Sequence, residues 1–293
     1  MHILIVGGGL GGLTAALCLS RSRENTVELL ELRPDLSPAG GGLQVRPPAS
    51  RLLHAWGLRG DLARAAEDTS AAVYRDLGTG EVATRAVAAR EEGAGVDWGV
   101  RRRDLVALLY GKIKGEERVK VRFGACAVGV RDGDGDGGRA AVRVREGDRG
   151  HESEVQVEAD LVLVADGIRS RLRAQVLQDL EGDFEPLLSE LTLYGVDLPL
   201  GAAELRANPA LRPLAAQGAT HLNVYLGRGL WVVTRHYPKL GRQSLLFGVR
   251  GATDQTGLWD EKGDLGAQGS ARECPGVRSL EVGGDAGAAE VDE

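Results

Sequence analysis

The sequence predicts a mixed α/β fold in which a parallel βαβ unit is interleaved with a mainly antiparallel β-sheet. Residues 2 to 31 read as an apolar strand, a glycine-rich turn, a helix and a second strand. A β-meander of three runs, "AVGVRD", "AAVRVRE" and "SEVQVEA", then separates the strands "VKVRFG" and "DLVLVADG". Residues 190 to 250 alternate in sheet fashion. A chain of 293 residues buries roughly three quarters of its unfolded surface and can hold a deep ligand cavity.

The glycine-rich turn has the spacing of a dinucleotide-binding motif. Gly7, Gly9 and Gly12 match G-x-G-x-x-G, where the glycines allow a tight turn, close approach of a pyrophosphate and close helix packing. The helix N-terminus that follows offers unpaired N–H groups and about half a positive charge. Glu31, nineteen residues beyond Gly12, ends the next strand and is expected to accept hydrogen bonds from ribose hydroxyls. An ordinary βαβ unit with fortuitous glycines is the alternative.

Composition argues against nucleic acid, structural metal and membrane as partners. The 36 Lys and Arg residues against 42 Asp and Glu give a net charge of −6, without a basic cluster for a phosphate backbone. Cys18, Cys126 and Cys274 match neither a disulfide framework nor a zinc site, which predicts a reduced, cytoplasmic setting. Because five of residues 7 to 12 are glycine and no positive segment precedes them, we expect no stable membrane insertion.

Four motifs, in the same order along the chain, resemble one family. A plain NAD-binding domain would keep alternating strands and helices after residue 32, whereas this chain runs into a glycine-rich loop, a helix and the β-meander. The motifs are "VGGGLGGLTAALCL" with Glu31, "GGGLQVRPPASRLLHAWGL", "RRRDL" and "DLVLVADGIRSRLR", with a softer match in "YLGRGLWVVTRHYP". Over roughly residues 1 to 260 the chain resembles the FAD-dependent aromatic-ring monooxygenases, the salicylate-hydroxylase-like and para-hydroxybenzoate-hydroxylase-like flavoproteins.

The resemblance implies that separate motifs hold FAD. Arg102, in an Arg-x-Asp-Leu pattern completed by Asp104 and Leu105, corresponds to the arginine that contacts the flavin nucleotide. Asp166 and Gly167 correspond to an Asp-Gly motif whose carboxylate lies near the flavin pyrophosphate. Without the resemblance, "RRRDL" reads as a basic helix start and Asp-Gly as a turn. The cofactor-binding candidates are Gly7, Gly9, Leu10, Gly12, Glu31, Arg102, Asp166 and Gly167.

The resemblance also implies the reaction. NAD(P)H would reduce FAD, and O2 would form a C4a-hydroperoxyflavin that hydroxylates an aromatic or other planar small molecule. No second G-x-G-x-x-G with a following acid is present, so NAD(P)H would bind transiently as a co-substrate. The chain departs from the family at Pro47-Pro48, where Pro-Asn is common, and so lacks a side-chain amide near the flavin ring.

The substrate cavity is expected among the later strands. Tyr225, Trp231 and Tyr237 would suit a planar ring, although strand alternation places some of them on the other face. His236 and Tyr237 are the catalytic candidates, with His236 as a base toward a phenol or, alternatively, a structural histidine at a strand end.

Two interleaved domains and a tail are predicted. The FAD-binding domain takes residues 1 to 70 and 98 to 185, the substrate domain takes residues 71 to 97 and 186 to 258, and residues 259 to 293 form an irregular or disordered tail. In the tail, "VGGDAGAA" with Asp285 imitates the third flavin motif of the family. Too few residues follow it for a helix, since an isolated helix needs about 12. The sequence looks truncated, or read into a different frame, soon after residue 260.

The tail leaves two alternatives to an active monooxygenase. One is a catalytically impaired flavin-binding remnant that lacks the third FAD motif. The other is a different FAD oxidoreductase on the same scaffold, such as a reductase or a halogenase, although the Trp-x-Trp-x-Ile pattern of halogenases is missing. The oligomeric state is left open.

One further motif imitates a calcium loop. Asp132, Asp134, Asp136 and Gly137 have the required spacing, but position twelve is Arg143 where a bidentate glutamate is needed. A hairpin turn without a metal ion is therefore expected.

Overall fold

A computed structural model describes most of the chain up to Arg250. The described residues are 1–36, 41–87, 95–133, 138–146, 153–178, 180–182, 184, 186–187, 189, 191–209, 211–212 and 220–250. The chain divides into Met1–Ala252 and Thr253–Glu293, and the second unit, with Asp285 and the predicted tail, lies outside the described residues.

A four-stranded parallel sheet forms the first layer of the fold. Its order is β12-β1-β2-β8, with bounds Leu161–Val164, His2–Val6, Thr26–Glu31 and Val119–Phe123. After His2, β1 is apolar from Ile3 to Val6 because both of its faces are buried there, as is typical of parallel sheets. Ile3 and Ile5 belong to the larger core cluster, whereas Leu4 and Val6 belong to a second cluster.

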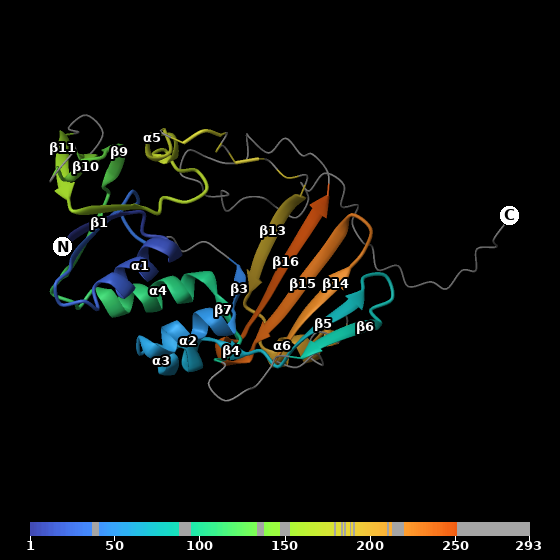
Figure 1. The fold of residues 1–293 in the computed structure, drawn as a ribbon. Coiled ribbons are helices and arrows are strands. Elements are labelled where there is room, and N and C mark those ends of the chain that lie inside the picture. The colour runs from blue at the N-terminus through green and yellow to red at the C-terminus, as the bar shows by residue number, and fades with distance from the viewer. Residues whose placement is uncertain are drawn as a thin grey trace. The chain divides into compact units, whose positions relative to one another are not determined.

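Helices cover one face of this sheet, and the β-meander covers the other. The larger core cluster joins β1 and β2 to α1 and α4, which lie side by side (Figure 1). α2 and α3 extend the same cluster. The bounds of α1 to α4 are Leu10–Leu19, Pro47–Ala55, Arg59–Ala65 and Arg102–Ile113. The second cluster joins Leu4 and Val6 to the meander strands β9 (Cys126–Arg131), β10 (Ala140–Glu146) and β11 (Ser153–Ala159).

A six-stranded sheet is built mainly from the later part of the chain. Its order is β13-β16-β15-β14-β5-β6, and every pairing is antiparallel except that of β14 with β5 (Figure 1). The bounds in sheet order are Leu191–Leu198, Arg242–Arg250, Leu230–Tyr237, His221–Leu226, Ala71–Asp76 and Val82–Val87.

A small antiparallel sheet connects the start of α4 to the residues that follow the glycine-rich loop. Its order is β3-β7-β4, with bounds Gly42–Val45, Trp98–Arg101 and Glu67–Asp68. β3 also contacts β16, which brings the small sheet against the six-stranded one. The remaining short elements are α5 (Arg173–Val176), α6 (Ala202–Ala207) and the 3-10 turn η1 (Pro238–Leu240).

The predicted fold class is confirmed, including the β-meander between β8 and β12. The division into a discontinuous FAD-binding domain and a substrate domain stays a prediction. Two local expectations were wrong. Residues 42–45 form a strand and not part of a loop, because they pair with β7. The run "IRSRLRAQVL" after Gly167 reads as a helix in the sequence, but only the four residues of α5 are helical, because the residues between Gly167 and α5 form turns and bends.

Residues 134–137 of the calcium-like loop, with Asp134, Asp136 and Gly137, lie outside the described part of the chain. The strands that flank the loop, β9 and β10, pair in antiparallel register. Within the described residues, no cluster of three or more His, Cys, Asp or Glu side chains is arranged to hold a metal ion. The helices of the described residues include none that is both long and apolar enough to span a bilayer.

Candidate functional site

The glycine loop after β1 is packed so closely at Gly7 and Gly12 that side chains are excluded at these two positions. Gly7 has φ +108°, and a Cβ atom there would lie 2.4 Å from the Ala165 carbonyl oxygen. A Cβ atom at Gly12 would lie 1.8 Å from the carbonyl oxygen of Gly7. At Gly9, the N-cap of α1, a Cβ atom would meet no atom within 4 Å. Leu10 then begins α1, so the open backbone at Gly9 faces the position where a phosphate group binds a helix N-terminus.

Glu31 closes this loop from the carboxyl end of β2. Its Oε2 accepts a hydrogen bond from the Gly8 N–H at 2.6 Å, and its Oε1 accepts one from the Arg33 N–H at 2.9 Å. Each carboxylate oxygen has a second lone pair, so the fixed carboxylate can still accept from a ribose hydroxyl. The carboxyl end of the strand is where open α/β sheets bind their ligands.

Asp166 and Gly167 lie directly beside the glycine loop. The Ala165 N–H donates to the Val6 carbonyl at 2.8 Å, which aligns the ends of β12 and β1. Gly167 has φ +87°, and no atom lies within 4 Å of the place a Cβ atom would occupy. The Asp166 Oδ2 accepts from the Arg171 N–H at 3.1 Å. The first and fourth candidate motifs therefore meet although about 155 residues separate them, because parallel strands carry both to the same sheet edge.

The three consecutive arginines at the start of α4 have different environments. Arg101 is buried: it donates to both carboxylate oxygens of Asp104, at 2.5 and 2.9 Å, and to Oδ2 of Asp197 in β13 at 3.2 Å. Arg102, the cofactor candidate, is half-buried, and its N–H donates to the Gly41 carbonyl at 3.0 Å. Arg103 is exposed. Asp104 therefore bonds Arg101, whereas Leu105 anchors the helix in the core.

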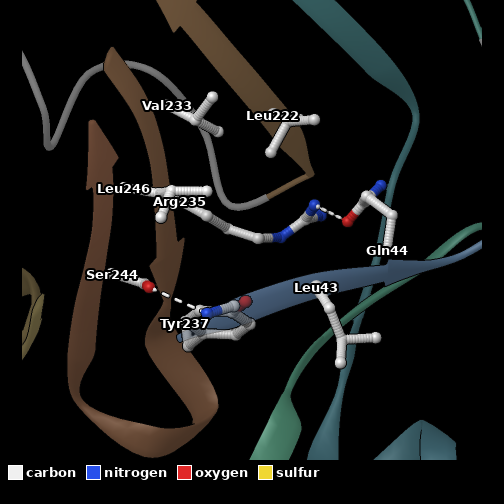
Figure 2. A pocket seen from close by; sticks show the side chains of 9 residues that line it. Leu43, Gln44, Leu222, Val233, Arg235, Tyr237, Ser244 and Leu246 are labelled. Carbon is white, nitrogen blue, oxygen red and sulfur yellow. Dashed lines mark hydrogen bonds between the residues drawn. The ribbon is translucent and has the colours of Figure 1, made fainter. Parts of the chain in front are cut away.

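A cavity of about 180 Å³ lies between β3 and the six-stranded sheet. Figure 2 shows the side chains of this cavity, with Leu43 and Gln44 on one side and the sheet residues on the other. Its lining residues are Gly42, Leu43, Gln44, Leu222, Val233, Arg235, Tyr237, Ser244 and Leu246. An apolar cavity of about 150 Å³ is large enough for benzene in another protein, so a single aromatic ring fits here.

A polar network forms one side of this cavity, and it was not predicted from the sequence. The Arg235 Nη1 donates to the Gln44 side-chain oxygen at 2.7 Å (Figure 2). Its Nη2 donates to the Thr69 hydroxyl at 2.7 Å. The Gln44 amide nitrogen donates to Asp97 at 3.0 Å, and Arg46 pairs with the same carboxylate at 2.8 Å. Burial raises the pKa of Asp97, against the opposing effect of Arg46 and Arg235. An Arg within an alternating strand and a Gln after a glycine run carried no recognisable pattern.

Strand alternation separates the two catalytic candidates. Val233, Arg235 and Tyr237 project from the same face of β15 and line the cavity, whereas His236 projects from the opposite face. Trp231 shares the face of Tyr237, where its ring crosses Gly248 on β16. Tyr225 pairs with Val232, on the face of His236. The predicted aromatic wall is therefore reduced to Tyr237 among the cavity residues.

Burial keeps Tyr237 protonated and His236 neutral at neutral pH. Tyr237 is fully buried, and this burial raises the pKa of its hydroxyl to about 12. Its hydroxyl lies close to the Gly42 backbone, where a Cβ atom would come within 2.6 Å. Burial lowers the pKa of His236 below its usual value. Tyr237 can therefore act as a hydrogen-bond donor in the cavity.

A second cavity, of about 190 Å³, lies beside the first turns of α1 and extends to Gln44. Leu10 and Thr14 of α1 line it together with Leu105 of α4 and Gln44 itself. Gln44 thus borders both cavities, one beside the first turn of α1 and one against the six-stranded sheet.

These features define the class of site as a dinucleotide-binding βαβ edge beside an apolar cavity. The open backbone at Gly9 and Gly167, the helix N-terminus and the fixed Glu31 carboxylate fit a pyrophosphate and a ribose. The chain belongs to the FAD binding domain family, whose model matches residues 1–193.

Curated relatives and solved structures agree with this family. The chain is 33% identical over 184 residues to the FAD-dependent monooxygenase OpS4 of Beauveria bassiana (strain ARSEF 2860), a match that covers 61% of the chain and 40% of that protein. It is 32% identical over 182 residues to the phenazine 1,6-dicarboxylic acid hydroxylase PhzS of Lysobacter antibioticus, a match that covers 60% of the chain and 43% of that protein. The crystal structure of CtdE in complex with FAD and substrate 4 matches with a TM-score of 0.70 at 19% identity, covering 87% of this chain and 58% of that chain.

The predicted resemblance to FAD-dependent monooxygenases, and FAD as the cofactor of the family, are confirmed by these matches. The chain spans less than half the length of the two curated relatives.

Proposed function

We propose that this chain is the FAD-binding and substrate-facing part of a cytoplasmic monooxygenase. In this proposal it uses NAD(P)H and O2 to hydroxylate an aromatic or other planar small molecule. The cavity of about 180 Å³ would receive the ring of the substrate. The cytoplasmic setting rests on the three scattered cysteines.

One observation carries the proposal. Gly7, Glu31 and Asp166 come from three separate parts of the sequence, and backbone contacts hold them at one edge of the parallel sheet. If the glycines of the βαβ unit were fortuitous, we would not expect a second open glycine with positive φ, Gly167, to lie beside the same loop. The relatives are FAD-dependent monooxygenases, which supports the same assignment.

Each candidate residue has a distinct role in binding. The N–H groups at the start of α1 would face the pyrophosphate, and Glu31 would accept from the ribose. Arg102, fixed to the Gly41 carbonyl through its backbone, would contact the nucleotide with its planar guanidinium. Asp166 would lie near the pyrophosphate and near the transiently bound NAD(P)H.

The cavity residues would orient the substrate and exclude water. Bound FAD supplies the redox and oxygen-transfer chemistry, which belongs to the cofactor. Tyr237 would donate its hydroxyl proton in a hydrogen bond to a substrate oxygen, because its raised pKa keeps that proton in place. The apolar side chains of Leu43, Val233 and Leu246 would exclude water from the ring. A base role for His236 stays a prediction, and no contact to this cavity supports it.

Three measurements on the purified chain test the proposal. FAD titration measures occupancy, stopped-flow absorbance measures flavin reduction by NADH or NADPH, and an oxygen electrode with product analysis measures hydroxylation. An active monooxygenase consumes oxygen in the presence of an aromatic ligand and forms a hydroxylated product. A folded chain that binds FAD without reduction or hydroxylation is the impaired remnant, and reduction without oxygen transfer indicates another FAD oxidoreductase.

A further inference from the structure

We propose that the flat indole of Trp231 extends the cavity, so that the site accepts elongated, uncharged aromatic ligands of two rings. This inference rests on the proposed function for the identity of the cavity as the substrate site. It concerns a second contact area beside the cavity, and it depends on how Trp231 lies on the six-stranded sheet.

The wall of the cavity continues along the six-stranded sheet. Val233 and Leu246 line the cavity and are cross-strand partners. Two residues further along the same strands, Trp231 and Gly248 are cross-strand partners as well. Because side chains two residues apart in a strand project from the same face, Trp231 lies on the cavity face, one row beyond Val233.

The indole of Trp231 lies flat on this face. A Cβ atom at Gly248 would lie between 2.4 and 2.6 Å from three bonded atoms of the ring, Cε2, Nε1 and Cζ2. Three neighbouring ring atoms are almost equally close because the face of the ring, and not its edge, covers the glycine. Gly248 therefore lets one face of the indole rest on bare backbone, and the opposite face is turned away from the sheet.

Apolar side chains flank the indole on the neighbouring strands. Leu193 of β13 pairs with Gly248, and Leu226 of β14 pairs with Trp231, so the four residues form one row across adjacent strands (Figure 1). Leu193 is 53% exposed, Leu226 is 50% exposed and Trp231 is half-buried. Among the described residues, no aromatic ring stacks on Trp231. The row is therefore an apolar surface that continues from a cavity with room for one ring.

The chemistry of this row favours an uncharged aromatic group. None of its four positions carries a charge, and the partner of Leu226 on β5 is Asp76. The Asp76 Oδ1 accepts from the N–H groups of Gly78 and Thr79, which keeps this carboxylate at the edge of the row, where it would repel an anion. The outer face of an indole is suited to offset stacking with another ring. A ligand of two rings can therefore place one ring in the cavity and the other on Trp231.

The test compares phenol with 4-phenylphenol, which adds a second ring, in the 293-residue chain. Isothermal titration calorimetry at pH 7 gives the dissociation constant of each uncharged probe without turnover. We expect the wild-type chain to bind 4-phenylphenol at least about tenfold more tightly than phenol, because the second ring is buried and stacked. Trp231→Leu should weaken 4-phenylphenol binding about fivefold and change phenol binding by less than about twofold, since one stacked aromatic pair is lost.

Phe247→Leu is the matched control for the loss of a ring. Phe247 precedes Gly248 on β16 and stacks on Tyr194, and strand alternation places it on the opposite face of the sheet. This variant should change neither dissociation constant by more than about twofold. Gly248→Ala keeps the indole of Trp231 but displaces it from the backbone, so it should also reduce the preference for 4-phenylphenol.

Four results overturn the proposal. One is an unchanged ratio of the two dissociation constants in folded Trp231→Leu or, if that variant does not fold, in Gly248→Ala. Another is an equal loss of 4-phenylphenol binding in Phe247→Leu. The third is a wild-type chain that binds 4-phenylphenol no more tightly than phenol, or binds neither probe. The fourth is a dimer in analytical ultracentrifugation that Trp231→Leu dissociates, because a second copy of the chain then covers the row.

The outcome is independent of the flavin chemistry. A chain that prefers 4-phenylphenol through Trp231 but does not hydroxylate any ligand supports the present inference and contradicts the proposed function. A chain that oxidises NAD(P)H and hydroxylates aromatic ligands, with no change in their binding on substitution of Trp231, supports the proposed function and contradicts the present inference.

Discussion

At the scale of single residues, the space around each glycine decides whether a side chain can be introduced there. Gly12 and Gly111 are both helical glycines, in α1 and α4, but their surroundings differ. A Cβ atom at Gly12 would lie 1.8 Å from the Gly7 carbonyl oxygen, whereas at Gly111 it would meet nothing within 4 Å. The glycine at position 12 is therefore required by packing, and the one at position 111 is not.

Gly12→Ala is expected to lower FAD occupancy at least tenfold, because the loop must move away from the helix N-terminus. Flavin absorbance after gel filtration gives the occupancy. The matched control, Gly111→Ala, should keep wild-type occupancy and gain up to about 1 kcal/mol in free energy of unfolding, since alanine favours the helix. Equal FAD occupancy in both variants would contradict the account of the loop.

His54 gives the chain a pH dependence of known sign. The Trp98 Nε1 donates to the His54 Nε2 at 3.0 Å, which requires an unprotonated acceptor. Burial, followed by the charge of Arg59, lowers the pKa of His54 from 6.5. A depressed pKa means that the folded state disfavours the proton, so this stability is present above pH 6.5 and is lost as the pH falls below it.

We expect His54→Gln to reduce the loss of stability at low pH, because glutamine can accept the same hydrogen bond from Trp98 without titrating. Urea unfolding from pH 7.5 to pH 5 measures the free energy of unfolding of both proteins. The wild-type chain should lose more stability than the variant over this range. Parallel curves would show that His54 does not titrate differently in the folded state.

At the scale of elements, a line of charges connects the start of α4 to the six-stranded sheet. Arg101 bonds Asp104 and Asp197, and Asp197 also accepts from the Arg242 Nε at 2.7 Å. Removing Arg101 would leave the partly buried Asp104 without its main partner and would break the link from α4 to Asp197, which keeps Arg242. Among the described residues, the adjacent Arg103 forms one ion pair, with Asp104 at 3.7 Å, from an exposed position.

Arg101→Met is accordingly expected to cost about 3 kcal/mol in free energy of unfolding, as for a broken buried ion pair. Arg103→Met, the matched control, should cost less than about 1 kcal/mol, as for an exposed pair. Urea denaturation measures both values. A similar small cost for the two variants would contradict the bridging role of Arg101.

The elements that could be predicted from the sequence have a clear period or an unusual motif. β1, α1 and β2 follow from the apolar runs and the glycine spacing, and β9 to β11 follow from alternation. β3 and β7 could not be predicted, because each has four residues and contains glycine, and they are strands through their pairing with each other and, for β7, with β4. The length of α5 was overestimated, since the residues between Gly167 and α5 form turns and bends around the Asp166 side chain.

At the scale of the whole molecule, the flavin-binding residues could be predicted from the sequence, whereas most of the cavity residues could not. The glycine loop, Glu31 and Asp166 belong to short motifs with a recognisable spacing in the sequence, so these candidates could be named in advance. The cavity depends on Gln44, Gly99 and Arg235, which meet only when β3, β7 and β15 are assembled. Tyr237 was recognised by its place in the family pattern, whereas the opposite direction of His236 follows from strand alternation.

The most direct test of the central claim is an FAD titration of the purified 293-residue chain, followed by flavin fluorescence and visible absorbance. One FAD per chain is expected to bind saturably, and Arg102→Ala and Gly12→Ala should weaken this binding at least tenfold, whereas Gly111→Ala should not. A folded chain that binds no FAD, or binds it equally well in all three variants, would contradict the assignment of the glycine loop and α4 as the flavin site.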